Sequence, residues 1–245
     1  MSTLSVQLYS VRDALADDMV GTLHRLHGIG LRHVELFDFV AWEDRYAEAL
    51  AITGLRAPSG HSPLLTAPDP TVAFDAAARL GVTTVIDPDV RAGWHSAAGI
   101  ASIASRLNEL VPAAADRGVT VGYHNHWWEF QSIGGRTGLE ILAAELDPRV
   151  VLEVDTFWAT VAGVDTPALL RRLGERVRFL HIKDGAVERD AATQQPAGAG
   201  AVNVRAVLTA APDAIRVLEF DTYSGDIFEG VATSHAFVTE TAATV

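Results

Sequence analysis

Four short apolar segments in the second half of the chain each end in two polar side chains spaced two residues apart. Side chains two apart along a strand point to the same face, so each pair can project into one site. Imidazole, carboxylate and ammonium groups held together suit proton transfer and metal binding. The four pairs are His124 and His126, Glu153 and Asp155, His181 and Lys183, and Glu219 and Asp221.

A metal ion is the expected occupant of such a site, because carboxylates gathered closely repel one another unless a cation neutralises them. The chain has no cysteine, so every ligand must be nitrogen or oxygen. Carboxylates with an imidazole suit one divalent ion, Mn²⁺, Co²⁺, Zn²⁺ or Mg²⁺. Such an ion polarises a carbonyl while a carboxylate takes and returns a proton, with Lys183 as a further acid or hydroxyl donor.

Each of these residues also has a purely structural interpretation. A lone His or Glu at a strand end is usually a hydrogen-bonded structural residue, and Glu153 could simply form an ion pair with Lys183 in the barrel wall. Trp127 could be core, or it could form an apolar wall for a sugar ring. Earlier segments supply fewer polar residues, from which we expect substrate contacts by Gln7, Tyr9, Glu35 and His61.

The elements that must position these residues follow a repeated pattern of an amphipathic stretch, a glycine and a short apolar run. Glycine past a helix end adopts the left-handed conformation easily, so each glycine indicates a helix-to-strand joint. With a first strand around residues 4–9, the pattern predicts eight βα units. The joints are Gly30, Gly54, Gly81, Gly118 and Gly174, with Asp147-Pro148 and Pro212-Asp213 serving the other two.

Eight such units in 245 residues predict an α/β fold, a single (β/α)8 TIM barrel with a closed parallel sheet and outer helices. One domain over residues 1–245 is expected. The rival open doubly wound sheet lacks a GxGxxG motif after its first strand. Catalytic groups of barrels lie at the carboxyl ends of strands, where all four polar pairs fall. Residues 184–203 are expected to form an active-site loop after strand seven.

Charge and hydropathy restrict the partners. The net charge of −12 argues against nucleic-acid binding, and no stretch is long and apolar enough to span a membrane. The opening residues lack a secretory signal, so a cytoplasmic location is expected. The tryptophans, including Trp42 and Trp94, could support a homo-oligomer formed through the mouth loops, or could belong to the pocket or core.

Three ordered motifs resemble those of the sugar phosphate isomerase/epimerase family, xylose-isomerase-like barrels of the AP endonuclease family 2 superfamily. They are YHNHWWEF at 123–130, VDTFWATVAGVDT at 154–166 and FLHIKDG at 179–185. SVQLYSVRD at the start and HVELFDF after the second helix fit the same branch, so the resemblance covers nearly the whole chain. It identifies a superfamily and no substrate.

The resemblance implies a metal held by Glu, Asp, His and Glu from successive strands. Asp155, His181 and Glu219 match the last three ligands. Sugar epimerases carry the first glutamate on strand five, where this chain has Gly122 and His124, so Glu129 is the candidate replacement. In those epimerases two glutamates shuttle the proton, which implies catalytic roles for Glu129 and Glu219, with His124 or His126 as alternatives.

Two departures from the family pattern bear on the substrate. Trp158 stands where the epimerases have the histidine of a DTFH motif, and we expect it at the substrate. The GEG turn after strand seven reads Gly198-Ala199-Gly200 and lacks its carboxylate.

These observations predict a metal-dependent isomerase or epimerase that forms an enediolate from a ketose or keto-sugar, phosphorylated or not. The small-molecule sugar is the expected partner, and few basic residues near the mouth favour an unphosphorylated one. The alternative is a dehydratase or lyase acting on an inositol-like or 3-keto-sugar substrate. A sugar-binding barrel without turnover stays open, and phosphodiester hydrolysis is disfavoured by the acidic charge.

Overall fold

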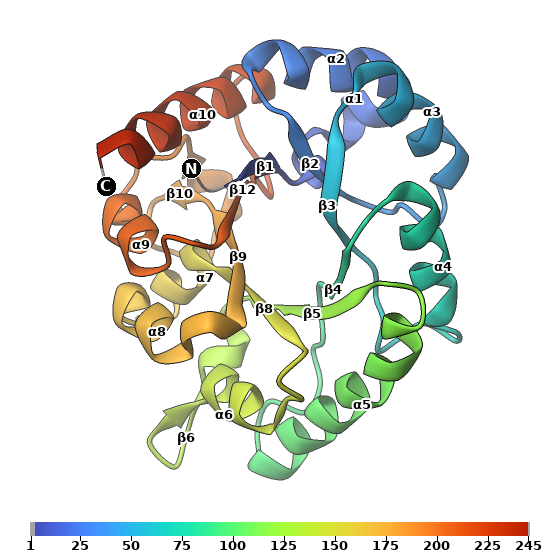
Figure 1. Cartoon of the computed structure of the whole chain (residues 1–245). Coiled ribbons are helices and arrows are strands. Elements are labelled where there is room, and N and C mark those ends of the chain that lie inside the picture. The colour runs from blue at the N-terminus through green and yellow to red at the C-terminus, as the bar shows by residue number, and fades with distance from the viewer. Residues whose placement is uncertain (1–2, 245) are drawn as a thin grey trace.

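The computed structural model describes residues 3–244 and shows a ring of parallel strands surrounded by helices (Figure 1). The strand order is β1-β12-β9-β8-β5-β4-β3-β2, and a parallel bridge between Gln7 and Glu35 joins the two edge strands. The predicted (β/α)8 barrel is therefore confirmed. Its strands are β1 Leu4–Val6, β2 His33–Leu36, β3 Arg56–His61, β4 Thr84–Asp87, β5 Thr120–His124, β8 Val151–Asp155, β9 Val177–Ile182 and β12 Ile215–Leu218.

Helices follow the strands and form the outer layer (Figure 1). Three of the predicted glycine joints, Gly30, Gly54 and Gly81, end helices with φ of 116°, 71° and 74°, a region that only glycine occupies without strain. Within residues 3–244, no helix is long and apolar enough to cross a membrane. The helices are α1 Arg12–Asp17, α2 Met19–Ile29, α3 Glu43–Thr53, α4 Thr71–Leu80, α5 Ala97–Ala115, α6 Gly138–Glu145, α7 Thr156–Val161, α8 Thr166–Leu173, α9 Val204–Ala210 and α10 Ile227–Thr244.

The first strand is shorter than predicted. It ends at Val6, and residues Leu8–Val11 form a 3-10 turn because the side chain of Gln7 accepts a hydrogen bond from the backbone N–H of Tyr9 at 3.1 Å. Two small hairpins decorate the barrel. They pair β6 Ser132–Ile133 with β7 Arg136–Thr137, and β10 Asp184–Gly185 with β11 Gln194–Gln195.

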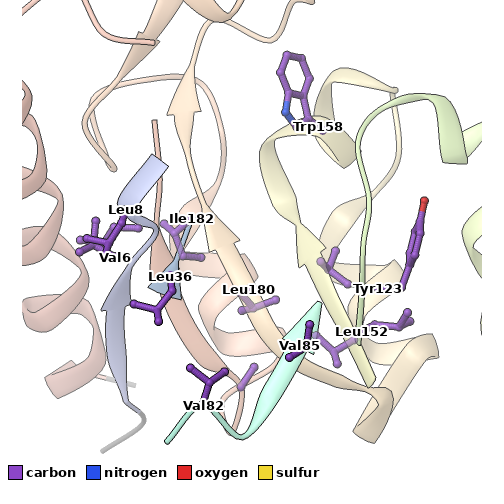
Figure 2. Packing of buried hydrophobic residues seen from close by; sticks show 14 of the residues in the cluster. Val6, Leu8, Leu36, Val82, Val85, Tyr123, Leu152, Trp158, Leu180 and Ile182 are labelled. Carbon is purple, nitrogen blue, oxygen red and sulfur yellow. The ribbon is translucent and has the colours of Figure 1, made fainter. Parts of the chain in front are cut away.

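Successive side chains of each strand point alternately outward to the helices and inward to the centre of the barrel, so the protein has two apolar regions. On the outer face, apolar side chains pack against the helices in one large core cluster, as Leu36, Leu152 and Leu180 do in Figure 2. Inside the ring, a smaller apolar cluster contains Ile86, Phe179 and Val217, with Val151 and Ile215 packed against it.

The polar pairs continue the inner face of the same strands. On β9, Phe179 belongs to the inner apolar cluster, and His181 and Lys183 follow at two-residue intervals. On β8, Val151 is followed in the same way by Glu153 and Asp155. The inner apolar cluster therefore lies beneath the polar residues at the carboxyl end of the barrel.

Candidate active site

A buried network of histidines and carboxylates fills the carboxyl half of the barrel. One oxygen of Glu153, Oε2, lies 2.7 Å from His61 Nε2, 3.0 Å from His124 Nδ1 and 3.1 Å from His181 Nε2. His181 Nε2 also lies 2.7 Å from Glu35 Oε1, so strands β2, β3, β5, β8 and β9 all meet at this point. The convergence expected from the strand ends is thus present.

Glu35 ties this network to the closure of the barrel. Its Oε1 accepts a hydrogen bond from Gln7 Nε2 at 2.8 Å, and its Oε2 accepts one from the Ser59 hydroxyl at 2.5 Å. Gln7 and Glu35, predicted as substrate contacts, are fully buried within this network, and neither lines the cavity described below.

Lys183 is the only lysine of the chain, and it lies among three carboxylates. Its Nζ is 2.9 Å from Asp155 Oδ2, 2.6 Å from Glu219 Oε2 and 2.8 Å from Asp221 Oδ1. Glu153 is not among these partners. The ion pair between Glu153 and Lys183 that the structural interpretation allowed is therefore absent. Lys183 instead neutralises the acidic groups at the mouth of the barrel.

The loop that follows β9 reaches the same cluster. Asp221 Oδ2 accepts a hydrogen bond from Gln194 Nε2 at 2.7 Å, and its backbone N–H donates to Gln194 Oε1. The buried carboxylate of Asp184 holds the loop by accepting four backbone N–H bonds. These come from Gly185, Gly198, Gly200 and Val202.

Opposite charges outweigh burial in the pKa values of His181 and Glu219, whereas burial prevails at Asp155 and raises its pKa to about 6. Burial would lower the pKa of His181, yet Glu153, Glu219 and Glu35 hold that pKa well above its usual value. Burial would raise the pKa of Glu219, yet Lys183 and His181 keep it well below its usual value. Surplus negative charge in a buried place favours any cation that can reach it.

His124 differs from its neighbours. Burial, together with the positive charge of His181, lowers its pKa well below the usual value, so its imidazole is neutral. Its Nδ1 faces Glu153 and its Nε2 lies 3.9 Å from Asp155 Oδ2. A neutral imidazole oriented by a carboxylate through one nitrogen presents the other nitrogen as a metal-binding lone pair.

The donor set fits a divalent cation. Ligand atoms of Asp155, His181 and Glu219 all lie within 4.8 Å of one another, as do those of a second group, His61, His124, Glu153 and His181. Asp155 Oδ1 caps α7 by accepting the N–H of Trp158, whereas its buried Oδ2 lies 2.9 Å from Lys183 Nζ. A divalent cation beside this oxygen, an imidazole and a second carboxylate would add to the neutralisation that Lys183 supplies.

Glu129 lies on the other side of the barrel wall. Consecutive residues of a strand face opposite ways, so Tyr123 points outward while His124 points inward. The Tyr123 hydroxyl donates to Glu129 Oε1 at 2.9 Å, and the backbone N–H of His126 donates to Glu129 Oε2 at 2.9 Å. Glu129 belongs to neither ligand group, and burial raises its pKa to about 8.

A cavity of about 360 Å³ opens above the network. Of the residues predicted from sequence, those that line it are Tyr9, His61, His124, His126, Lys183, Glu219 and Asp221. Trp127 and Trp158 are not among its lining residues. Trp127 stacks under the Arg189 guanidinium at 3.7 Å, and Trp158 is buried with its indole N–H unpartnered within residues 3–244.

Other lining residues were missed. They follow strands β2, β3 and β4, so the rule applied to strands five to eight could also have found them. Trp94 and Trp128, expected either at an oligomer interface or inside, are buried, and both indole N–H groups donate to the Val90 carbonyl. The missed lining residues are Phe37, Asp38, Pro63, Pro88, Asp89 and Arg91.

Comparison with known proteins places this geometry in a family. The family described as "xylose isomerase-like TIM barrel" matches residues 23–219. The chain belongs to this family. Its matched region runs from α2 to the end of the last barrel strand and includes every residue of both ligand groups. No protein of curated function matches the sequence.

Solved structures share the fold at low sequence identity. A sugar phosphate isomerase/epimerase from Parabacteroides distasonis ATCC 8503 is 23% identical, with a TM-score of 0.83 over 99% of this chain and 94% of that one. The probable 3-DHS dehydratase AsbF from Bacillus anthracis, involved in petrobactin synthesis, is 14% identical with a TM-score of 0.75, over 97% and 98% of the chains. The protein IolI, crystallised with a zinc atom, is 15% identical with a TM-score of 0.72, over 100% and 99%.

Proposed function

We propose that this protein is a divalent-metal-dependent isomerase or epimerase of a ketose or keto-sugar. The observation that carries the proposal is the buried ligand group of Asp155, His181 and Glu219 beside a cavity lined by proton-handling side chains. The similarity to a sugar phosphate isomerase/epimerase and to the zinc-containing IolI supports both the reaction class and the metal.

We assign the metal to Asp155, His181 and Glu219, with His124 as the fourth ligand in place of Glu129. In the metal-free protein the carboxylates around His181 favour its protonated form, so the cation would bind there in place of that proton. His124 is neutral, oriented by Glu153, and directs Nε2 toward Asp155. Both oxygens of Glu129 already accept hydrogen bonds on the outer side of the wall. When bound, the cation supplies Lewis-acid polarisation of a carbonyl oxygen.

Proton transfer at the carbon beside that carbonyl is assigned to Glu219 and His126, which both line the cavity. Lys183 and His181 keep Glu219 ionised, and burial lowers the pKa of His126 well below its usual value, so it is neutral. Each group can therefore accept a proton at neutral pH. The group that removes the proton then holds it as an acid and can return it to the neighbouring carbon, which moves the carbonyl. Inversion requires the other group to take up a proton from solvent and deliver it to the opposite face of the same carbon.

The cavity suits a sugar without phosphate. Four carboxylates line it, from Asp38, Asp89, Glu219 and Asp221, and they offer acceptors for hydroxyl groups. The single arginine of the lining, Arg91, is already paired with Asp89 at 2.7 Å. A phosphate dianion would meet net negative charge in this cavity.

Dehydration is the second candidate reaction, favoured by His61. This imidazole lines the cavity, and although burial would lower its pKa, Glu35 and Glu153 raise that pKa to about 10. It is therefore protonated at neutral pH and can donate a proton to a departing hydroxyl. The same proton abstraction would then end in loss of water, as the name of the AsbF neighbour indicates for that protein.

The metal assignment is tested by elemental analysis of purified protein incubated with Mn²⁺ or Zn²⁺. We expect about one equivalent in the wild type and in the control Asp213→Ala/His95→Ala, whose residues are exposed, and none in Asp155→Ala/His181→Ala. Because Lys183 is the only lysine, protein labelled with [¹⁵Nζ]lysine gives one side-chain ammonium signal, which bound Mn²⁺ should broaden beyond detection. Absence of metal in the wild type would remove the mechanism.

The reaction class is tested by NMR in D₂O with a panel of ketoses and keto-sugars. Epimerisation predicts deuterium at the inverted carbon, and dehydration predicts a new unsaturated product. Wild type should exchange substrate protons, whereas His126→Gln should reduce the rate by at least about a hundredfold while still binding the metal. Sugar binding without any exchange would show a barrel that does not catalyse the reaction.

A further inference from the structure

A second cavity adjoins the polar one. It has a volume of about 480 Å³ and lies between the segment after β2 and the start of α4. Asp38, His61 and Pro63 line both cavities, so the two cavities lie next to each other at these residues. A molecule held beside His61 could therefore extend from one into the other.

The second cavity is lined mainly by apolar side chains, unlike the first. The fully buried Phe39 contributes one wall, and its ring lies directly over Gly60, where an added Cβ would come within 3.0 Å. Two carboxylates line the second cavity: Asp38 stands where the two cavities adjoin, and Asp69 already accepts two hydrogen bonds from Thr71. The remaining wall therefore offers contact area and few free polar partners.

Two exposed valines make this surface unusual. Val40 is 38% and Val72 is 46% exposed, and both line the second cavity. They are two of the four large apolar side chains that are exposed within the described residues. Apolar groups gathered in a concave site beside a polar cavity mark a binding surface.

The backbone at the junction is also unusual. Asp38 has φ of 50°, and within residues 3–244 it is the one residue other than glycine with a positive φ. Its carbonyl accepts the N–H groups of Ala41 and Trp42, which fixes the turn that carries Val40. The turn therefore presents Asp38 to the polar cavity and Val40 to the apolar one.

We propose that the apolar cavity is a second substrate subsite, which binds an apolar substituent carried by the sugar in the polar cavity. The substrate class is then a glycoside or similar sugar conjugate with an aromatic or branched aliphatic group, rather than a free sugar. This inference rests on the proposed function only in taking the polar cavity as the site of the sugar ring.

The test compares phenyl with methyl glycosides of glucose, galactose and xylose, each as both anomers, by titration calorimetry. Wild type should bind the phenyl member of at least one pair roughly tenfold more tightly or better, because the ring buries apolar area. Val72→Trp, which fills the cavity, and Val40→Asp, which charges it, should bring the two dissociation constants within about twofold. Ile52→Trp, at a 53% exposed site on α3 outside the cavity, should keep the preference.

The binding data test the apolar subsite, and the proton-exchange data test the proposed isomerase. A phenyl preference absent from every pair, or retained in both Val72→Trp and Val40→Asp, overturns the subsite. The same samples are assayed for proton exchange in D₂O. A phenyl preference without exchange of any keto-sugar proton leaves the subsite standing and counts against the isomerase, whereas exchange without the preference overturns the subsite alone.

Discussion

Two buried glutamates, Glu219 and Glu129, lie on opposite sides of the barrel wall, and their pKa values are shifted in opposite directions. Glu219 lies inside, between Lys183 and His181, and its pKa is held well below the usual range despite burial. Glu129 lies outside with two uncharged hydrogen-bond donors, and burial raises its pKa to about 8. Burial is common to both, so the difference comes from neighbouring cations.

The inside and the outside of the strand ring differ in the partners that surround buried acids. Inside the ring, acids and bases from five or more strands share partners, and no carboxylate there is isolated from a positive neighbour. Outside it, Glu129 anchors the turn after β5 through the His126 backbone and the Tyr123 hydroxyl. A strongly shifted pKa thus occurs in both places, and only the charged partners distinguish the proposed site from the structural layer.

Removing the ammonium group of Lys183 should have the largest effect on stability. Lys183→Met leaves Asp155, Glu219 and Asp221 buried or half-buried without their ammonium partner. We expect the free energy of unfolding of the metal-free protein to fall by about 3–5 kcal/mol in urea titrations at neutral pH. Added Mn²⁺ should recover part of the loss, because a divalent ion can neutralise the same carboxylates.

The matched control is Arg171→Met, which removes an exposed positive charge from α8 and should change stability by less than about 0.5 kcal/mol. If Lys183→Met were as stable as this control, the inner carboxylates could not be held by Lys183, and the contrast with Glu129 would fail.

A smaller effect, dependent on pH, is expected for Glu129→Gln. The folded-state pKa of about 8 lies above the usual 4.5, so the folded protein binds this proton more tightly than the unfolded chain. The resulting stability is fully present below about pH 4.5 and is lost as the pH rises to about 8. Glutamine keeps the shape of the protonated acid and cannot ionise.

The stability of Glu129→Gln relative to wild type should therefore increase by about 2–4 kcal/mol between pH 5 and pH 9, as measured by urea unfolding at each pH. Glu188→Gln, at an exposed position, serves as the control and should follow the wild-type profile. A flat difference for Glu129→Gln would mean that this carboxylate is ionised throughout, as Glu219 is.

The smallest expected effect concerns the apolar cluster beneath the inner network. A Cβ at Gly122 would lie 2.8 Å from Ile86 Cγ1 and 3.4 Å from Val151 Cγ2. Gly122→Ala should therefore lower the free energy of unfolding by about 1–3 kcal/mol. Gly28→Ala on α2, where the added Cβ meets nothing within 4 Å, should raise it by about 0.5–1 kcal/mol.

If both alanine variants were more stable than wild type, the inner cluster would be loosely packed, and the polar network above it would lack a rigid base. Thermal unfolding followed by circular dichroism measures both changes.

Much of the fold was predictable from local chemistry. Glycine joints and short apolar runs predicted eight βα units. Each of seven strands begins two or three residues after its predicted joint, namely β2, β3, β4, β5, β8, β9 and β12. The prediction for the first strand was too long, because the side chain of Gln7 bonds the backbone N–H of Tyr9 and turns the chain early. A side-chain-to-backbone bond of this kind leaves no periodic signal.

The site divides in the same way. Two-residue spacing indicated that His181 and Lys183, or Glu153 and Asp155, share a face, because side chains alternate along any strand. Spacing could not show which partners meet across strands, and Glu153 turned out to contact three histidines rather than Lys183. Spacing also could not show on which side of the barrel wall a residue in the loop after a strand would lie. Glu129, which follows β5, is such a residue.

The alternation of strands and helices, the end of the barrel that gathers polar residues, and the surplus of acidic residues could all be read from the sequence. These are local or additive properties of the chain. Two features became visible only in the folded chain. His61, His124 and His181 surround one oxygen of Glu153, and an apolar cavity adjoins the polar one. Contacts between distant segments depend on strand register and barrel closure, which no single segment encodes.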